Sequence, residues 1–232
     1  DSATWPVYLF GALAAYGFQL TANLFAVALA SCVSVALDGR QPVIADGFLI
    51  ARSRFGVVAQ WAALQLTVGL ILSLIQNAAN NSGEALVGGI LRALGGAAWA
   101  IATFFVVPVL ALEELGPIDT IKRSAKVMRE RWGEGVVGNA GIGIVLLPFI
   151  LVSVFAMVGM AHFMNRGQAV PGVASGVIAG LSFLIGAALV GTAGSIFRVV
   201  LFRYASDGTV PSGWNGEQLE AAFKPKRPSG RI

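Results

Sequence analysis

Five apolar runs, each long enough to cross a lipid bilayer, constrain the fold of this chain more than any other feature of its sequence. A helix needs about 20 apolar residues to cross the hydrocarbon core of a bilayer. The runs that meet this length cover residues 7–37, 57–76, 85–112, 136–161 and 173–202. Only 12% of the 232 residues are charged, too few to coat a soluble domain of this size. We therefore predict an all-α, multi-pass transmembrane helix bundle over residues 1–205, followed by a C-terminal tail over 206–232.

The positive charges of the chain fall on one side of the predicted bundle. Of the 16 Lys and Arg residues, all except Arg92 and Arg166 lie in the two longer connectors or near the C-terminal end. Because cytoplasmic loops carry an excess of Lys and Arg, the pattern predicts a bacterial plasma-membrane protein with its N-terminal end outside and its tail in the cytoplasm. We expect Arg92, inside the third run, to reach back to the outer interface. Since the chain opens at Asp1 rather than Met, we also expect a further segment upstream.

Both longer connectors contain a segment that is apolar on one face and basic on the other. The apolar residues at helical spacing are Ile44, Phe48, Ala51, Phe55 and Val58 in the first segment and Ile118, Ile121, Ala125, Met128 and Trp132 in the second. Such helices either lie in the bilayer interface, with their basic side chains on anionic headgroups, or pack as elbows on neighbouring spans. The basic residues expected to meet lipid are Arg52, Arg54, Lys122, Arg123, Lys126, Arg129 and Arg131.

The two connectors also share sequence motifs. An R-x-R-aromatic-G pattern occupies residues 52–56 and 129–133, in each case directly before an apolar run. Pro42 and Pro117 follow the end of a run, and we expect each to open a short helix as a first-turn proline. A D-G-x-x-P pattern at 38–42 returns at 207–211. These likenesses predict an internal parallel repeat of span, tight turn, amphipathic helix and span.

Several residues inside the runs are expected to join helices to one another. Gln19 and Asn23 lie four residues apart, on one helix face, and must find hydrogen-bond partners, for which Gln60, Gln65, Gln76 and the intramembrane Asn139 are available. Small residues allow close helix approach, either within the chain or with a partner subunit. The predicted packing residues are Gly138, Gly141, Gly176, Gly180, Ala187 and Gly191. Pro108 and Pro148 are the candidate kink sites.

The segment at residues 99–133 carries a specific set of motifs. F-x-V-P-V stands at 105–109, E-x-x-G-P at 113–117, K-R-S at 122–124 and W-G at 132–133. In these motifs the chain resembles uncharacterised multi-pass membrane proteins of bacteria and archaea that are related to the membrane domain of glycerophosphoryl diester phosphodiesterases. The resemblance implies an architecture and no activity, because the related enzymes act through a separate soluble domain that these 232 residues do not contain.

The residues offer little chemistry for catalysis. His162 is the only histidine and Cys32 the only cysteine, so neither a two-histidine metal site nor a Ser-His-Asp triad can form within one chain, and His162 gives only a weak hypothesis of a pigment or metal ligand. We expect no cofactor, no nucleic-acid partner and no enzymatic activity. The favoured hypothesis is an accessory, scaffold or assembly subunit that contacts membrane lipids and other membrane-protein subunits. The alternative is a transporter, a permease or a lipid-handling protein.

Overall fold

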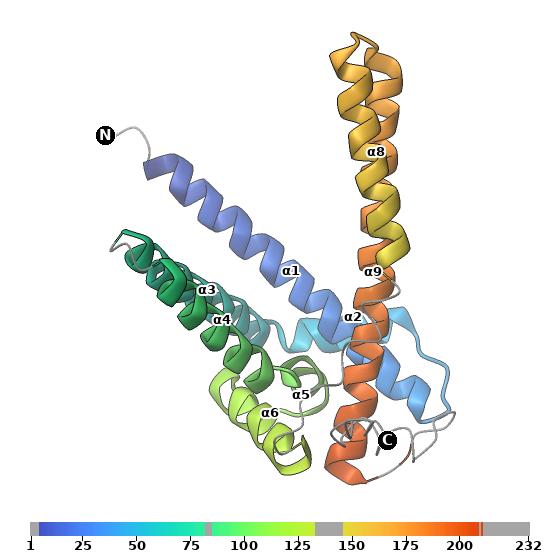
Figure 1. The fold of residues 1–232 in the computed structure, drawn as a ribbon. Helices are drawn as coiled ribbons and strands as arrows, with labels where there is room; N and C mark the ends of the chain where they lie inside the picture. The colour runs from blue at the N-terminus through green and yellow to red at the C-terminus, as the bar shows by residue number, and fades with distance from the viewer. Residues whose placement is uncertain (1–4, 82–84, 133–145, 209, 211–232) are drawn as a thin grey trace, which may run out of the picture. The chain divides into compact units, whose positions relative to one another are not determined.

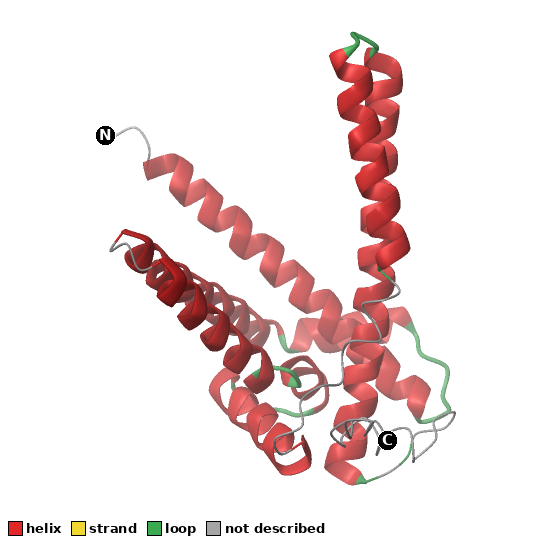
Figure 2. Cartoon of the chain, viewed as in Figure 1, coloured by secondary structure: helices red, strands yellow, loops and turns green. Residues whose placement is uncertain are grey.

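The computed structural model describes residues 5–81, 85–132, 146–208 and 210, and these residues form helices and short connections without any strand (Figures 1 and 2). The helices are α1 (Trp5–Leu37), α2 (Ile44–Ser53), α3 (Phe55–Asn81), α4 (Ala85–Ala102), α5 (Val106–Leu112), α6 (Pro117–Trp132), α8 (Leu147–Asn165) and α9 (Ala169–Asp207). The predicted all-α fold is therefore confirmed.

Five stretches of helix are long and apolar enough to cross a membrane, as the sequence predicted. They are Trp5–Leu37, Phe55–Ala79, Leu86–Leu112, Leu147–Asn165 and Ala169–Asp207. The second predicted run was too short, because α3 continues through the polar residues that follow Gln76 to Asn81. The first residues of the fourth predicted run, 136–161, lie outside the described residues.

The chain forms two compact units. The first unit contains α1 to α6 together with the end of α9 from Arg198 onward, and the second contains α8 with α9 up to Phe197. Helix α9 thus contributes to both units: its apolar first part belongs to the second unit, and its last turns belong to the first.

The third span is broken one turn before Pro108. Helix α4 ends at Ala102 and α5 begins at Val106, and the two intervening amides at Phe104 and Val106 bond to carbonyls only three residues back. Proline cannot donate to the carbonyl four residues earlier, here Phe104, and its ring crowds that carbonyl. The Pro108 kink predicted from the sequence is therefore a complete interruption of the helix. Pro148, the other predicted kink site, instead lies in the first turn of α8, where proline is tolerated.

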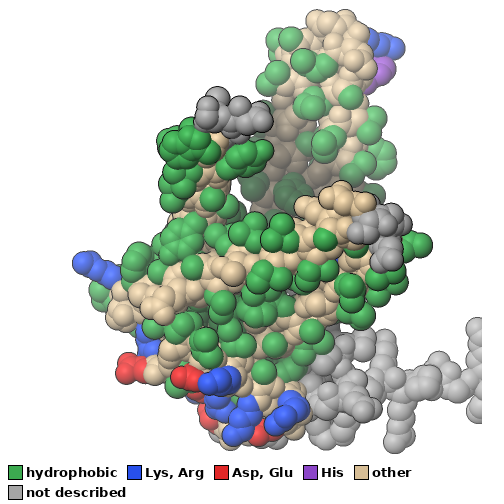
Figure 3. All heavy atoms as spheres, turned by 90° about the vertical axis from the view of Figure 1, so that its left-hand side faces the viewer, with side chains coloured by type: hydrophobic (Ala, Val, Ile, Leu, Met, Phe, Trp, Pro, Cys, Tyr) green, Lys and Arg blue, Asp and Glu red, His purple; other side chains and the backbone are tan. Residues whose placement is uncertain are grey.

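The core of the first unit lies around the second half of α1. Its largest fully buried side chains come from α1, α3, the α4–α5 break, α5, α6 and the end of α9: Val27, Val58, Phe105, Val106, Val109, Leu110, Thr120, Val199, Val200 and Leu201. By contrast, the first half of α1 exposes large apolar side chains, including Phe10 and Phe18. Figure 3 shows hydrophobic side chains over the visible face of the first unit and charged side chains gathered toward its lower end. Such an extensive exposed apolar surface suits a lipid environment.

The contact face of α2 differs from the predicted stripe. Gly47 and Ala51 are buried against α1, whereas Ile44 and Phe48 remain exposed. A Cβ on Gly47 would lie 2.6 Å from the Cys32 Sγ and 2.7 Å from the Ala28 carbonyl oxygen, so only glycine allows this approach. Ala51 belongs to the predicted stripe, whereas Gly47 does not, because close helix packing selects the smallest side chains rather than the most apolar ones. The exposed members of the stripe, Ile44 and Phe48, leave the interfacial alternative open.

The buried face of α6 is also rotated from the predicted one. Thr120, Ser124 and Val127 are buried together with the predicted Met128, whereas Ile118 is exposed. Ser124 sets this rotation, because its Oγ accepts a hydrogen bond from the backbone N–H of Phe105 at 3.0 Å, within the α4–α5 break.

The two short connector helices begin differently. Pro117 is the first residue of α6, as predicted, but α2 begins at Ile44 after an extended Val43, so Pro42 lies outside the helix. The shared D-G pattern does have a common structure: Gly39 and Gly208 both have positive φ, +75° and +69°, and end α1 and α9. Glycine favours this left-handed conformation at helix C-termini.

Helices α8 and α9 form a hairpin that makes up the described part of the second unit. Gly167, at φ +73°, turns the chain between them. The Ser153 Oγ donates to the carbonyl oxygens of Phe149 and Ala179, at 2.7 and 3.1 Å, and so ties the two helices together. A Cβ on Gly186 would lie 2.5 Å from the Cβ of Phe149, so the hairpin is closely packed at this point.

Candidate functional site

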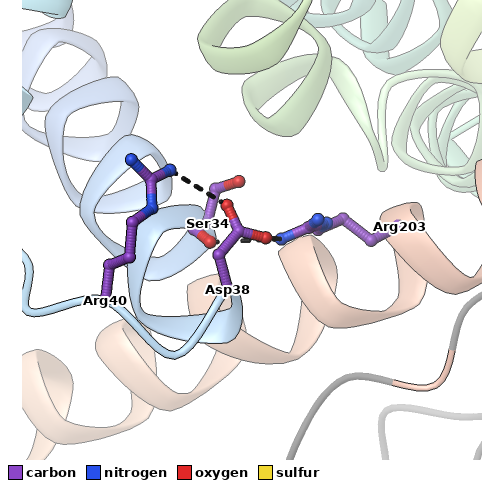
Figure 4. A network of polar contacts seen from close by, with 4 residues as sticks. All are labelled: Ser34, Asp38, Arg40 and Arg203. Atoms are coloured by element: carbon purple, nitrogen blue, oxygen red, sulfur yellow. Dashed lines mark hydrogen bonds and ion pairs between the residues drawn. The ribbon is translucent and has the colours of Figure 1, made fainter.

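The end of α1 and the end of α9 are joined by an ion-pair network (Figure 4). The Arg203 guanidinium donates to Asp38 Oδ1 at 2.6 Å and to the Ser34 carbonyl oxygen at 3.1 Å, and Arg40 donates to Asp38 Oδ2 at 3.1 Å. The hydrogen bond from Arg203 is the main cause that lowers the pKa of the Asp38 carboxyl, and Arg40 adds to it. Asp38 therefore stays ionised, and its charge is held by two cations.

A second network surrounds Glu113, where α5 ends. The Arg123 Nε lies 3.0 and 3.2 Å from the two carboxylate oxygens of Glu113. Arg54 donates to the Glu113 carbonyl oxygen at 2.5 Å and reaches Glu114 Oε1 at 3.4 Å. The structure thus pairs Glu113 with Arg123 of α6.

The two networks face a common polar cleft. The cleft has a volume of about 280 Å³ and is lined by Ser34, Leu112, Glu113, Arg123, Phe202, Arg203, Ser206 and Asp207. Both of its arginines are already paired with carboxylates, Arg123 with Glu113 and Arg203 with Asp38. The cleft therefore offers balanced charge, and its hydrogen bonds and ion pairs connect α1, α5, α6 and α9.

The predicted lipid-contacting residues divide into paired and free groups. Arg54 and Arg123 are engaged in the networks just described, and Lys122 and Lys126 make exposed ion pairs with Asp119 and Glu130 on α6 itself. Arg52 and Arg129 are exposed and make no salt bridge within the described parts of the chain. Arg131 lies in the last turn of α6, and its side chain is outside what the structure describes.

The intramembrane amides Gln19 and Asn23 share one partner on α3. The Gln65 Oε1 accepts hydrogen bonds from Gln19 Nε2 at 2.9 Å and from Asn23 Nδ2 at 2.7 Å. Asn23 is buried, so this bond satisfies an amide that water does not reach. Asn139, the third predicted intramembrane amide, lies outside the described residues.

Arg92 lies on the face of α4 that packs against α3. Its guanidinium donates to the Gln76 side-chain oxygen. Gly88 and Gly95, one turn to either side, approach Ala79 and Leu72 of α3. The prediction that Arg92 reaches back to the outer interface did not name this partner, and the Gly88-x-x-x-Arg92-x-x-Gly95 spacing was the signal that could have revealed a packed face.

The predicted packing residues of α9 differ in their surroundings, although they share one helix face. Gly176 packs against α8, where an added Cβ would lie 2.7 Å from the Met160 Sδ. Gly180 and Gly191 have open space around them among the described residues, and Ala187 is exposed. Gly138 and Gly141 lie outside the described residues. The sequence analysis did not predict Gly186 as a packing residue, although an added Cβ there would lie only 2.5 Å from the Phe149 Cβ of α8.

Buried polar atoms gather around the α4–α5 break. The Arg198 guanidinium lies 5.4 Å from the centre of the Phe104 ring, and Ser124 caps the amide of the next residue, Phe105. Helices α6 and α9 therefore both contact the interruption that Pro108 creates. Phe105 belongs to the F-x-V-P-V motif and Ser124 to the K-R-S motif. Nothing in the spacing of the two motifs indicated that they are in contact.

Within the described residues, no group of three His, Cys, Asp or Glu side chains could hold a metal ion. The charged side chains are engaged mainly with one another at the helix ends, and within the spans Gln65 holds the amides of Gln19 and Asn23. The arrangement can therefore hold helices together and present apolar and basic surfaces.

Comparison with known proteins gives the chain a family but no characterised relative. No curated protein and no solved structure matches the sequence. A family model described as a family of unknown function, DUF6159, matches residues 7–213, which include four of the five candidate spans in full, the first span from residue 7 onward, and both polar networks. The chain therefore belongs to the DUF6159 family.

Proposed function

We propose that this protein is a non-catalytic membrane scaffold, an accessory or assembly subunit that binds other membrane proteins through its spans and anionic lipid through its basic inner helices. The observation that carries the proposal is that the polar side chains of α1 and α4 named above bond to glutamines of α3. Gln65 accepts hydrogen bonds from Gln19 and Asn23, and Gln76 accepts one from Arg92. The one ionisable side chain of this set, Arg92, is therefore already hydrogen-bonded. Such pairs fix helices in place and provide no route for coupled ions.

The one-sided charge supports an orientation for this scaffold. Helices α2 and α6 and the end of α9 carry most of the described Lys and Arg residues, and the positive-inside rule assigns them to the cytoplasm. The chain then begins outside, and its tail lies in the cytoplasm of a bacterial cell. Arg52 and Arg129, exposed and without carboxylate partners among the described residues, supply charge for anionic headgroups.

A transporter or a lipid-handling protein is the second candidate. The polar cleft at the inner ends, with its two arginines, favours it. The pairing of both arginines with carboxylates counts against it, because a solute would have to displace these ion pairs. The link to glycerophosphoryl diester phosphodiesterases rests on the resemblance of the central motifs alone, since the family match carries no activity.

Purification in a mild detergent, followed by quantitative mass spectrometry of the co-purifying proteins, tests the scaffold proposal. Recovery of another membrane protein at a fixed stoichiometry supports it. A lone, monodisperse protein that conducts a solute across liposome membranes would contradict it and favour the transporter.

Vesicle binding tests the lipid part of the proposal separately. Replacing Arg52, Lys126 and Arg129 with Gln removes exposed charges without touching the ion pairs of Arg54 and Arg123. Each basic residue near an anionic surface contributes about 1 kcal/mol, so each replacement should weaken adsorption to phosphatidylglycerol vesicles about fivefold. Unchanged adsorption of the triple variant would reject this role.

A further inference from the structure

An apolar groove runs along the seam between α1 and α2. It consists of two depressions, of about 280 and 230 Å³, which share Phe25 and Phe48. The rings of these two residues meet edge to face with centroids 5.1 Å apart. One end of the groove is formed by Cys32 and Ile44, and the other by Thr21 and Arg52.

Arg52 is the only charged side chain that lines the two described depressions. It is exposed and makes no salt bridge with any described residue. Arg54, two residues later, is only 18% exposed and already holds Glu113 and Glu114. The groove thus combines a long apolar surface with one available guanidinium at its end.

These features match a ligand with an apolar chain and an anionic head. A guanidinium binds phosphate through two parallel, charge-assisted hydrogen bonds. Exposed Phe48 and Phe55 beside Arg52 offer apolar contact that a soluble anion could not use. We propose that the α1–α2 groove is a binding site for an anionic phospholipid, whose phosphate binds Arg52 and whose apolar part contacts Phe25, Phe48 and Phe55 in the same depression.

This site rests on the proposed contact between basic helices and lipid, but it is more specific than surface adsorption. A general basic surface binds anionic lipid in proportion to its charge, so Arg52 and Arg129 would be equivalent. A groove site depends on Arg52 alone, because Arg129 lies on α6 and does not line the groove. Comparing the two arginines therefore separates the site from general adsorption.

Cys32 reports on occupancy of the groove. It lines the groove and is the only cysteine of these 232 residues, so N-ethylmaleimide modifies this chain at one position. In mild detergent, added phosphatidylglycerol should slow this modification, and phosphatidylcholine should do so much less. In Arg52→Gln, the phosphatidylglycerol concentration for half-maximal protection should rise at least about tenfold, as expected when the charge-assisted hydrogen bonds to the phosphate are lost. Arg129→Gln, with the same change in charge, should behave as the wild type.

Native mass spectrometry of phosphatidylglycerol retained by the same three proteins provides a second measurement, with the retained lipid reduced in Arg52→Gln alone. Equal protection by the two lipids, equal behaviour of the two variants, or unchanged modification and retention would overturn the site. Protection of Cys32 by a co-purifying protein instead of lipid would also overturn it.

If Arg52→Gln and Arg129→Gln weaken vesicle adsorption equally without affecting Cys32, the site fails and the proposed lipid contact stands. If Cys32 is protected as expected but no subunit co-purifies, the site stands and the scaffold fails.

Discussion

Removing the Ser124 hydroxyl should destabilise the first unit by a predictable amount. The Ser124 Oγ lies 3.0 Å from the amide nitrogen of Phe105, and both residues are 0% exposed. Ser124→Ala therefore leaves one buried N–H without its acceptor, and water cannot replace it. The cost of an unsatisfied buried amide is about 1 to 3 kcal/mol. The cavity left by one missing oxygen is small, so the free energy of unfolding should fall by about this amount.

Equilibrium unfolding in mixed micelles, with increasing sodium dodecyl sulfate, measures this change. Tryptophan fluorescence gives the signal, because Trp61 and Trp99 stack in the first unit with ring centroids 5.7 Å apart. Ser53→Ala is the matched control, since Ser53 is exposed and bonds only to the Ile50 carbonyl of its own helix. It should change the free energy of unfolding by less than about 0.5 kcal/mol. Equal effects of the two substitutions would refute the reasoning that Ser124 supports the break.

Three further substitutions probe the contacts that join α1 to its neighbours. Gln65→Leu removes the shared acceptor of Gln19 and Asn23 and should lower the free energy of unfolding by about 0.5 to 2 kcal/mol in the same assay. Gly47→Ala places a Cβ 2.7 Å from a backbone oxygen of α1, so α2 must shift, and the cost should be about 1 to 3 kcal/mol. Asp38→Asn should lower the melting temperature near neutral pH, and its difference from the wild type should shrink as the pH falls below 3.8 and through the lowered pKa of the folded carboxyl, where the wild-type side chain also becomes protonated.

Each of these predictions has its own control. Gln60 is exposed on α3, so Gln60→Leu should be close to neutral. A Cβ at Gly56 would meet no atom within 4 Å, and Gly56→Ala should leave the protein unchanged or slightly more stable. The sign of the Asp38 effect follows from a pKa lowered chiefly by Arg203: the stabilisation is present above the unfolded value, 3.8, and is lost as the pH falls through the folded one. A difference that persists or grows in acid would show that the ionised carboxylate is not responsible.

The sequence predicted the spans well because a bilayer imposes one simple length and polarity rule. Apolar runs alone located five helices, and Pro108 marked the break in the third. Gln19 and Asn23, four residues apart, indicated a shared face, and Gln65 was one of the possible partners. Local pattern was sufficient in these cases, because the determining interactions lie within one helix or obey its periodicity.

Contacts between helices were predicted less well. The packed faces of α2 and α6 coincide only in part with the predicted apolar stripes, because Gly47 and Ser124, neither of them strongly apolar, also take part in the packing. In a membrane protein, apolar side chains are as stable against lipid as against protein, so hydrophobicity does not distinguish the two surfaces. The pairing of Asp38 with Arg203 joins residues 165 positions apart, and no spacing rule in the sequence indicates it.

Cysteine labelling in intact cells tests the central claim, that the basic helices and the end of α9 share the cytoplasmic face, most directly. In a Cys32→Ser background, single cysteines replace exposed Lys126 on α6, Asp207 at the end of α9, and Arg166 between α8 and α9. A membrane-impermeant maleimide should label the cysteine at position 166 in intact cells, and those at 126 and 207 only after permeabilisation. Labelling of 126 and 207 from opposite sides of the membrane would contradict the five-span account.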